Sequence, residues 1–186
     1  SNVETNIVAF DWDEDGKAEV VLRGADGMIV HHKNGTTNVG NMKINTRNTI
    51  SHTANMTYTN TGDEFLLYLN GETGEPYQVM KYPLERGKAD DWGDGYGHRS
   101  SKYFFGAPYL DGKKPSIFLA RGIYTKHIMA AYDVDPSSHQ LNLRWRWDSP
   151  LSGQWFGQGY HNYGIADVDW DGRDEIVYGS MVIDDN

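Results

Sequence analysis

The residue types best suited to chemistry lie in the segment 167–175, which reads DVDWDGRDE. Oxygen donors stand at alternate positions, four of them side-chain carboxylates and one, at position 7, a backbone carbonyl: Asp167, Asp169, Asp171, Arg173 and Glu175. A loop of this kind wraps a hard cation, and Gly172 permits the sharp bend that turns the carboxylates inward. Because oxygen ligands suit Ca²⁺ and the segment has no Cys or His, the pattern predicts a calcium site rather than a zinc site.

The same spacing occurs near the start of the chain, in the segment DWDEDGKAE. Its equivalent donors are Asp11, Asp13, Asp15, Lys17 and Glu19. Either loop by itself is also compatible with an acidic turn that binds no metal, since Asp and Gly are ordinary turn residues. Two copies in the same setting favour calcium. We expect the ion to be structural, because an empty loop would hold mutually repelling carboxylates.

Short apolar runs flank both loops and must position them. Strands are predicted at 7–10 and 19–23 around the first loop, and apolar runs at 164–166 and 176–178 flank the second. The repeated unit is therefore strand, acidic loop, strand.

Further runs bounded by turn residues predict strands at 28–32, 64–70, 77–82, 103–110, 116–120, 127–133 and 141–147. In the last of these, alternation predicts four apolar side chains on one face: Leu141, Leu143, Trp145 and Trp147. Asp111-Gly112 repeats the turn of the acidic loops, but Ala107 and Tyr109 stand in place of the first two acids. We expect this third copy to keep the turn and to bind no metal.

Residues 33–62 are rich in Asn, Thr and Gly and hold few large apolar side chains. They predict a long loop insertion, either a functional one or a surface excursion without a function. Residues 1–186 are expected to form a single unit, with Ser1-Asn2 as a remnant of tag removal. Because the chain stops directly after a strand, we expect it to be a fragment of a longer protein.

The abundance of glycine, at 21 residues, and the lack of long helical periodicity indicate an all-β protein with many turns. Repeated units of short strands predict a partial β-propeller of about three to four blades, built from antiparallel four-stranded sheets with calcium-binding Asp loops. An eight-stranded sandwich is the rival fold, but it does not explain the repeated strand–loop–strand unit.

Composition excludes several classes of function. The net charge is −9 and there is no basic stripe, so nucleic acid is not expected as a partner. The chain has no Cys, which excludes disulfides and thiol catalysis. No segment is long and apolar enough to predict a membrane span.

Four segments carry a resemblance to polysaccharide lyase family 11, the rhamnogalacturonan lyases: FDWDEDGKAEVVLRGADG (10–27), DDWGDGYGHRS (90–100), YLDGKKPSIFLARGIYTK (109–126) and GQGYHNYGIADVDWDGRDEIVYGSMVIDD (157–185). The resemblance implies a middle segment of an eight-bladed propeller that holds several Ca²⁺ ions. It implies β-elimination of the rhamnose–galacturonic acid linkages of rhamnogalacturonan I, an acidic plant polysaccharide of pectin. It also implies a secreted or periplasmic bacterial protein.

The Arg and Lys proposed for catalysis in that family belong to later blades, so no catalytic residue is assigned here. Candidate substrate ligands are Arg121 and Lys126 after a predicted strand, and His161 and Asn162 in the segment GYHN. A strand-end arginine suits a uronate carboxylate, although a structural ion pair is the alternative. A loop histidine with only structural contacts is likewise the alternative for His161.

Aromatic residues next to these candidates predict a platform for sugar stacking: Trp155, Phe156 and Tyr160. Filling gaps between blades is their alternative role. For the whole chain, the alternative is a non-catalytic calcium-stabilised fragment or carbohydrate-binding module that lacks the catalytic blades. With either function, open blade edges predict that the chain self-associates. An integrin-like adhesion propeller is a third possibility, which leaves the LARG and GYHN segments without a role.

Overall fold

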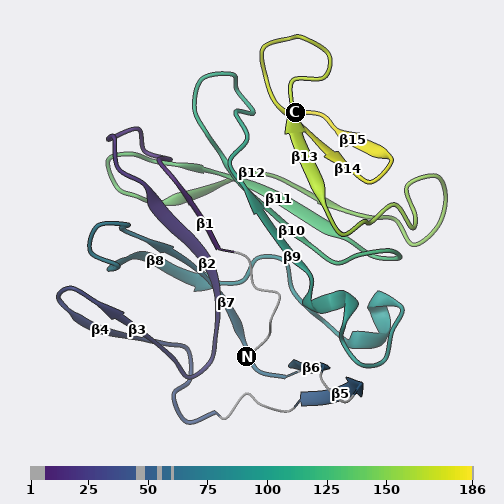
Figure 1. Ribbon diagram of the computed structural model, residues 1–186, viewed down its shortest axis with the longest axis horizontal. Coiled ribbons are helices and arrows are strands. Elements are labelled where there is room, and N and C mark those ends of the chain that lie inside the picture. Colours follow the sequence, from purple (N-terminus) through teal and green to yellow (C-terminus); the bar gives the residue numbers. More distant parts are fainter. Residues whose placement is uncertain (1–6, 45–48, 54–55, 60, 186) are drawn as a thin grey trace.

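A computed structural model describes residues 7–44, 49–53, 56–59 and 61–185, with side chains for all of these except 49–53 and 56–59. The predicted tag remnant Ser1-Asn2 lies outside the described residues. The described part of the chain is all-β and antiparallel (Figure 1). Its elements are β1 (Ile7–Phe10), β2 (Glu19–Ala25), β3 (Met28–His32), β4 (Gly35–Val39), β5 (Thr49–Thr53), β6 (Met56–Thr59), β7 (Glu64–Leu69), β8 (Pro76–Lys81), η1 (Ala89–Trp92), η2 (Arg99–Ser101), β9 (Tyr103–Gly106), β10 (Ile117–Arg121), β11 (Ile128–Val134), β12 (Leu141–Asp148), β13 (Tyr163–Ala166), β14 (Glu175–Tyr178) and β15 (Met181–Ile183).

The central sheet has the order β12-β11-β10-β9. Strands β9, β10 and β11 are buried along almost their whole length, and their sequences YFFG, IFLAR and IMAAYDV are nearly continuous apolar runs. Such runs are typical of strands that are covered on both faces. The central sheet is therefore the middle layer of the molecule.

Alternate side chains of the central sheet enter two different cores. On one face, Phe105 and Leu119 pack with residues of the sheet β1-β2-β7-β8, among them Tyr68. On the other face, Phe104 and Phe118 pack with side chains of β14 and β15. The three sheets thus lie face to face in the order of the chain, with the β13-β14-β15 sheet last (Figure 1).

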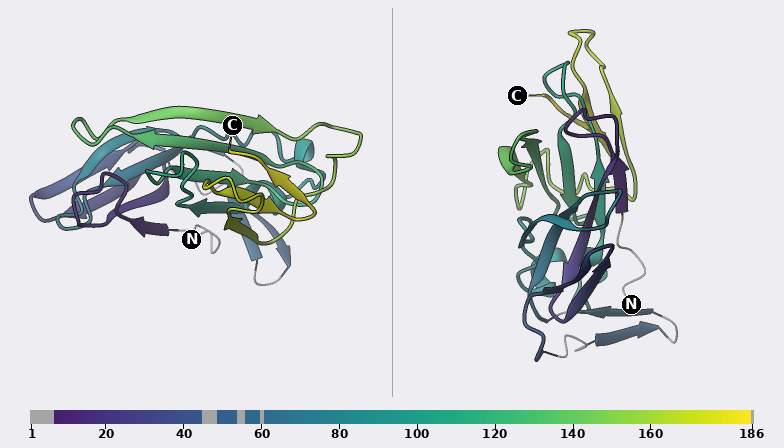
Figure 2. Two further views of the ribbon diagram at one scale, coloured as in Figure 1. Left: turned by 90° about the horizontal axis from the view of Figure 1, so that it is seen from above. Right: turned by 90° about the vertical axis from the view of Figure 1, so that its left-hand side faces the viewer.

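The first sheet contains an insertion between its second and third strands. β2 pairs directly with β7. The chain between these two strands therefore leaves the sheet, forms the β3–β4 and β5–β6 hairpins, and then returns to the sheet. Val30 and Val39 of the first hairpin pack on Leu67 and Leu69 of β7, which covers the outer face of this sheet. In side view, the β5–β6 hairpin and the loop between β13 and β14 lie at opposite ends of the molecule (Figure 2).

The prediction of a long loop over 33–62 is wrong for the described part of that segment. It contains β4, which pairs with β3, and the β5–β6 hairpin. The sequences of these strands, GTTNV, TISHT and MTYT, are rich in threonine. Threonine is β-branched and favours strands, so grouping it with Asn and Gly as a loop former led to the error.

The strands predicted at 7–10 and 28–32 are confirmed with the same bounds. The strand predicted at 103–110 ends earlier, at Gly106. Pro108 follows, which has no N–H for the ladder, and its carbonyl accepts the N–H of Ser116 at 2.8 Å in a connection outside the sheet.

Strand β12 contradicts the prediction of one apolar face. The pairing with β11 shifts between Ala131 and Tyr132, so Arg144 is an extra residue in β12. A bulge of this kind reverses the alternation of side chains beyond it. Leu143 is consequently 56% exposed, whereas Trp145 packs on the core between the central and last sheets.

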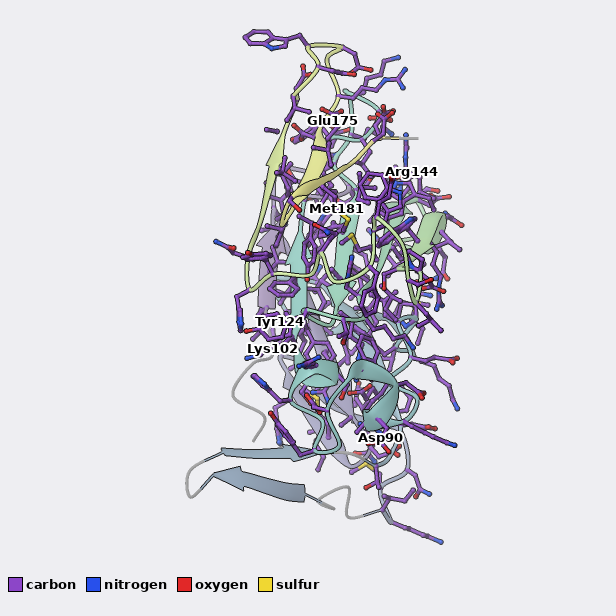
Figure 3. All side chains as sticks on the ribbon, turned by 90° about the vertical axis from the view of Figure 1, so that its right-hand side faces the viewer. Asp90, Lys102, Tyr124, Arg144, Glu175 and Met181 are labelled. Carbon is purple, nitrogen blue, oxygen red and sulfur yellow. The ribbon has the colours of Figure 1, made fainter. Side chains whose placement is uncertain are left out.

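The described helices are the single 3-10 turns η1 and η2, and none of the described helices could span a membrane. Trp92 of η1 is fully buried, so the polar segment 86–101 is packed around this side chain. Figure 3 shows Asp90 of this segment and Glu175 at opposite ends of the molecule. The 3-10 turns therefore lie far from the second acidic loop.

Candidate functional site

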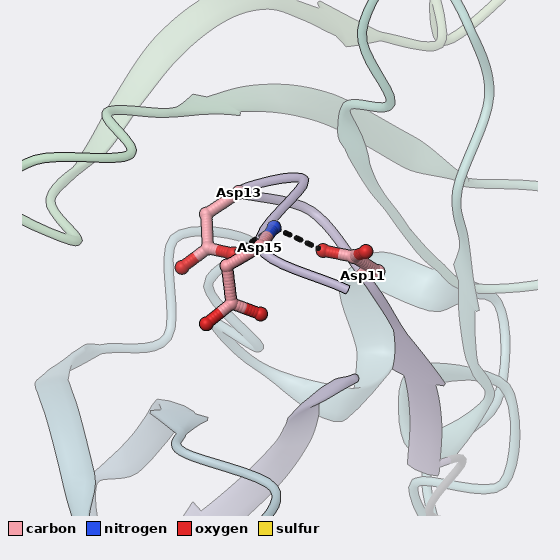
Figure 4. Close-up of side chains that lie close together, drawn as sticks. All are labelled: Asp11, Asp13 and Asp15. Carbon is pink, nitrogen blue, oxygen red and sulfur yellow. Dashed lines mark hydrogen bonds between the residues drawn. The ribbon is translucent and has the colours of Figure 1, made fainter. Parts of the chain in front are cut away.

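The first acidic loop joins β1 to β2 and folds onto its own carboxylates (Figure 4). The N–H of Asp15 donates to Oδ1 of Asp11 at 3.1 Å and to Oδ1 of Asp13 at 3.2 Å. The N–H of Gly16 donates to Oδ2 of Asp11 at 2.9 Å. Glu14 and Gly16 have positive φ angles of 62° and 87°, which make the bend. Carboxylate oxygens of the three aspartates consequently lie within 4.8 Å of one another.

The second acidic loop joins β13 to β14 and has the same conformation. The N–H of Asp171 donates to Asp167 at 3.1 Å and to Asp169 at 3.2 Å, and the N–H of Gly172 donates to Asp167 at 3.0 Å. Trp170 and Gly172 have positive φ angles of 69° and 91°. Equal spacing in the sequence has thus produced equal backbone geometry at two distant places in the chain.

In each loop, the side chain of the glutamate at position 9 is hydrogen-bonded to the backbone near the start of the loop. An Oε2 atom accepts the N–H of the residue at position 2 in both cases, Glu19 from Trp12 at 3.1 Å and Glu175 from Val168 at 2.7 Å. Both glutamates are only 2% exposed. Burial, together with the charges of the neighbouring aspartates, raises the pKa of each carboxyl above its ordinary value. The hydrogen bonds within each loop therefore do not compensate fully for the burial and mutual repulsion of its carboxylates.

The remaining oxygen of Glu175 tests whether a cation would fit. Oε1 is buried and has no hydrogen-bond partner among the described residues. A buried carboxylate oxygen without a partner is costly, and a hard cation held by oxygen donors would supply one. Two sets of acids include this residue: Asp167 with Asp169, and Asp171 with Asp185. The donor set therefore fits a cation such as Ca²⁺.

The residues at position 7 were predicted to contribute backbone carbonyls only, and their side chains point to other partners. Lys17 Nζ lies 2.8 Å from Glu72 Oε2, in an exposed ion pair. Arg173 Nη1 lies 2.6 Å from Asp185 Oδ2. Coordination by the two carbonyls stays a prediction.

The third copy of the turn, at Asp111-Gly112, lies beside the second acidic loop and is hydrogen-bonded to it. Asp111 Oδ1 accepts the N–H groups of Lys113 and Lys114 at 2.8 and 2.7 Å, which keeps the turn. Tyr109 donates its N–H to Asp174 Oδ2 at 2.7 Å, and its carbonyl accepts the N–H of Asp174 at 3.1 Å. Among the described residues, Asp111 belongs to no group of three possible metal ligands. That this copy binds no metal stays a prediction.

Arg121, predicted as a uronate ligand, is fully buried. Its guanidinium donates to Glu64 at 2.6 Å, to the carbonyls of Ser100 and Leu84 at 2.7 and 2.9 Å, and to the Tyr103 hydroxyl at 3.1 Å. This is the structural ion pair that was the alternative for this residue. A sugar could reach the guanidinium only after these contacts break, so we do not propose Arg121 as a substrate ligand.

Lys126, the second basic candidate, is partly exposed. Its Nζ atom lies 4.8 Å from the centre of the Trp92 ring, a cation–π contact. Its side chain thus stays partly open to solvent, while the Trp92 ring is itself buried.

His161 and Asn162 are exposed and lie beside a residue that was not predicted, Tyr124. The Tyr124 hydroxyl is 2.5 Å from His161 Nε2. Gly159 makes this contact possible, because its N–H and carbonyl pair with the backbone of Tyr124 at 3.3 and 2.9 Å, an approach that leaves no room for a Cβ. Asn162 lines a shallow pocket together with Tyr160, Tyr163, Gly164, Val177, Gly179 and Ser180.

The predicted aromatic platform is exposed. Trp155, Phe156 and Tyr160 all present large parts of their rings to solvent. Within the described residues they do not fill a gap between sheets, which was their alternative role.

Sequence reasoning missed His139 and Glu64. His139 Nδ1 lies 3.1 Å from Asp13 Oδ2, and its ring stacks on Tyr77 with 3.9 Å between centroids. No local pattern pointed to this contact, because the histidine is in the turn after β11. Glu64 begins an apolar strand, and a lone acid in such a run was the available signal for a buried carboxylate.

Comparison with known proteins identifies close relatives. Residues 2–186 match the family model described as "Rhamnogalacturonan lyase family 11, C-terminal domain". The chain is 40% identical over 187 residues to the rhamnogalacturonan exolyase YesX of Bacillus subtilis, and 40% identical over 183 residues to the rhamnogalacturonan endolyase YesW of the same organism. Each match covers 97% of this chain and 28% of the relative, so the chain spans under a third of their length.

Solved structures of such enzymes agree with the fold. The crystal structure of the exotype lyase YesX superposes with a TM-score of 0.84 at 40% identity, covering 97% of this chain and 28% of that one. A rhamnogalacturonan lyase of Bacillus licheniformis gives the same TM-score at 37% identity, covering 97% of this chain and 30% of that one.

Proposed function

The chain belongs to rhamnogalacturonan lyase family 11, and we propose that it forms part of an enzyme that cleaves rhamnogalacturonan I by β-elimination. The observation that carries the proposal is the family match over residues 2–186. In such a reaction a base removes the C5 proton of a galacturonosyl residue, the bond from C4 to the glycosidic oxygen breaks, and an unsaturated uronide remains. A cation near the uronate carboxylate would stabilise the carbanion.

We propose that the three sheets are consecutive blades of a β-propeller. The sheets β1-β2-β7-β8 and β12-β11-β10-β9 have four strands each, and β13-β14-β15 has three. Their face-to-face packing in chain order, with separate cores between them, supports this arrangement. Self-association through open blade edges stays a prediction.

The two acidic loops are proposed calcium sites with a structural role. Their support is the shared geometry of both loops and the unpartnered Oε1 of Glu175. Asp11, Asp13 and Asp15 would hold one ion, and Asp167, Asp169 and Glu175 the other. Burial and, after it, repulsion by the aspartates raise the pKa of each position-9 glutamate, and a bound ion would offset both.

The proposed contact surface for polysaccharide is the exposed set Tyr124, Lys126, His161 and Asn162, with the aromatic residues near it. Hydroxyl, imidazole and amide groups suit sugar hydroxyls, and an accessible ammonium suits a uronate. A substrate of this kind is outside the cell, so we propose a secreted or periplasmic location.

A lyase assay tests the proposed function. The chain is incubated with rhamnogalacturonan I and Ca²⁺, and the ultraviolet absorbance of the unsaturated product is followed. Polygalacturonate, which lacks rhamnose, is the matched control substrate. We expect any product to come from rhamnogalacturonan I only, and its appearance would place the base within this chain.

Product from polygalacturonate alone would overturn the assignment of substrate. No product from a folded, calcium-responsive chain would overturn catalysis by these residues and favour the non-catalytic module. Lys126→Met and His161→Gln, tested next, would show whether the exposed surface takes part.

A further inference from the structure

A carboxylate outside the repeated pattern lies beside the second acidic loop. Asp185 follows β15 and is 2% exposed. One of its oxygens lies within 4.8 Å of carboxylate oxygens of Asp171 and Glu175. Three acids from two segments of the chain therefore meet at one place, two of them buried.

The unpartnered oxygen of Glu175 indicates that this place lacks a ligand. Glu175 Oε2 accepts the N–H of Val168, while Oε1 is buried without a partner among the described residues. The other acids of the cluster cannot satisfy Oε1, because ionised carboxylates only accept, and the guanidinium of Arg173 contacts Asp171 and Asp185 instead. A divalent cation between the three acids would satisfy it and offset their repulsion.

Arg173 already bridges two of these acids. Its Nη1 atom is 2.6 Å from Asp185 Oδ2, and its Nε atom is 3.9 Å from Asp171 Oδ2. The arginine side chain is 46% exposed, so it can turn into solvent without leaving a buried charge behind. Its guanidinium thus occupies the place where a cation bound to Asp171 and Asp185 would lie.

The first loop offers a built-in comparison. Its position-7 residue, Lys17, pairs with the exposed Glu72, which belongs to no ligand group among the described residues. The residue ten places after Glu19 is Ile29, whereas Asp185 stands ten places after Glu175. Among the described residues, the first loop therefore has no equivalent of Asp185 or of the bridging arginine. A different basic side chain, His139, lies beside it, with Nδ1 3.1 Å from Asp13 Oδ2.

We propose that Asp185 is an added cation ligand of the second loop, acting with Asp171 and Glu175. Arg173 is an internal counter-cation that holds Asp171 and Asp185 when the metal is absent and is displaced when Ca²⁺ binds. This inference rests on the proposed calcium sites. It adds that the two loops differ: the second has a further acid ligand and an arginine competitor, and the described residues around the first include no equivalent of either.

Calcium titration by calorimetry tests the inference, in a background where the first loop is disabled by Asp13→Asn and Asp15→Asn. Asp185→Asn is expected to weaken binding at the second loop by about tenfold or more, because a charged ligand is lost. Arg173→Gln is expected to tighten binding by roughly two- to fivefold, since it removes an ion pair whose arginine is half exposed and therefore competes only weakly. Circular dichroism confirms that each variant is folded.

The matched control is Lys17→Gln in a chain whose second loop is disabled by Asp167→Asn and Asp169→Asn; binding at the first loop should not tighten. Unchanged affinity in both Asp185→Asn and Arg173→Gln would overturn the inference while leaving the calcium sites intact. No calcium binding by the unaltered chain would instead overturn the calcium sites themselves. If Asp185→Asn does not fold, tightening by Arg173→Gln alone supports the competition, and its absence contradicts it.

Discussion

Arg121 Nη1 lies 2.6 Å from Glu64 Oε2, and this buried ion pair joins the central sheet to the first sheet. Glu64 Oε1 is also 2.8 Å from Arg23 Nη2, so one carboxylate binds guanidinium groups from β10 and β2. A buried charge is tolerated when it is paired and hydrogen-bonded. The Glu64 carboxylate is thus a buried polar link between the two sheets.

Replacing Glu64 with Gln should destabilise the protein strongly. The substitution keeps the size of the side chain but leaves Arg121 and Arg23 buried without their counter-charge. A loss of about 3–5 kcal/mol in the free energy of unfolding is expected. Denaturant titration monitored by circular dichroism measures it. The control is Glu72→Gln, which breaks the exposed pair with Lys17 and should change stability little. Equal effects of both substitutions would contradict the role given to Glu64.

Glu64 should also set a limit on stability in acid. Burial alone would raise the pKa of its carboxyl, but Arg121, Arg23 and Arg86 outweigh this and lower the pKa from 4.5 to about 2. The unfolded state therefore takes up the proton first as the pH falls. The stabilisation is fully present above pH 4.5 and is lost progressively toward pH 2. Melting temperatures between these pH values should fall less steeply in Glu64→Gln than in the unaltered chain.

His127 should act in a separate, higher pH range. It is fully buried, and neither ring nitrogen has a hydrogen-bond partner among the described residues. Burial lowers the pKa of this imidazole from 6.5 to about 4, so the folded state stays neutral while the unfolded state is protonated. Its contribution to stability is present above pH 6.5 and is lost as the pH falls toward 4. His127→Phe should flatten the melting temperature over this range; an unchanged slope would show that another group causes the loss.

The strands that could be predicted best are those whose burial is regular. β10 is apolar from Ile117 to Ala120 because both of its faces are covered, and the run IFLA shows this directly. β12 could not be predicted correctly, because the bulge at Arg144 depends on its pairing with β11 and leaves no mark on the alternation. The threonine-rich strands in 33–62 have sequences that suit a loop or a strand equally, and pairing decides between them.

In the candidate sites, too, features set by neighbouring residues in the sequence could be predicted, and features set by contacts between distant segments could not. The acidic loops could be predicted because every carboxylate of the pattern lies within nine positions of the sequence. The burial of Arg121 could not, because Glu64, Ser100 and Leu84 reach it from other elements. Asp185 is likewise brought to the second loop by the β14–β15 hairpin, which no local spacing specifies.

Removing calcium should lower the melting temperature. An ion that binds only the folded state at about a hundred times its Kd stabilises it by roughly 2.7 kcal/mol, which corresponds to about 5–10 °C for a chain of this size. Differential scanning calorimetry with and without EDTA measures the shift. The double substitution Asp169→Asn with Asp171→Asn should remove only the part of this melting-temperature shift that comes from calcium at the second loop. An unchanged melting curve in EDTA would refute the calcium sites, and loss of binding at both loops would refute their independence.

Gly122 allows the central sheet to meet the 3-10 segment, and replacing it with Ala should be costly. Its φ is 95°, and a Cβ would overlap the Trp92 ring and the carbonyl of Lys126. Gly153 is the matched control, since its φ is 93° but a Cβ there would meet nothing within 4 Å. Gly153→Ala should cost about 1 kcal/mol from the backbone conformation alone, whereas Gly122→Ala should cost roughly 3 kcal/mol or more. Denaturant titration of both variants separates the cost of the backbone conformation from the cost of the contact between the added Cβ and Trp92. Similar losses would mean that the backbone conformation, rather than contact with Trp92, is what requires glycine at this position.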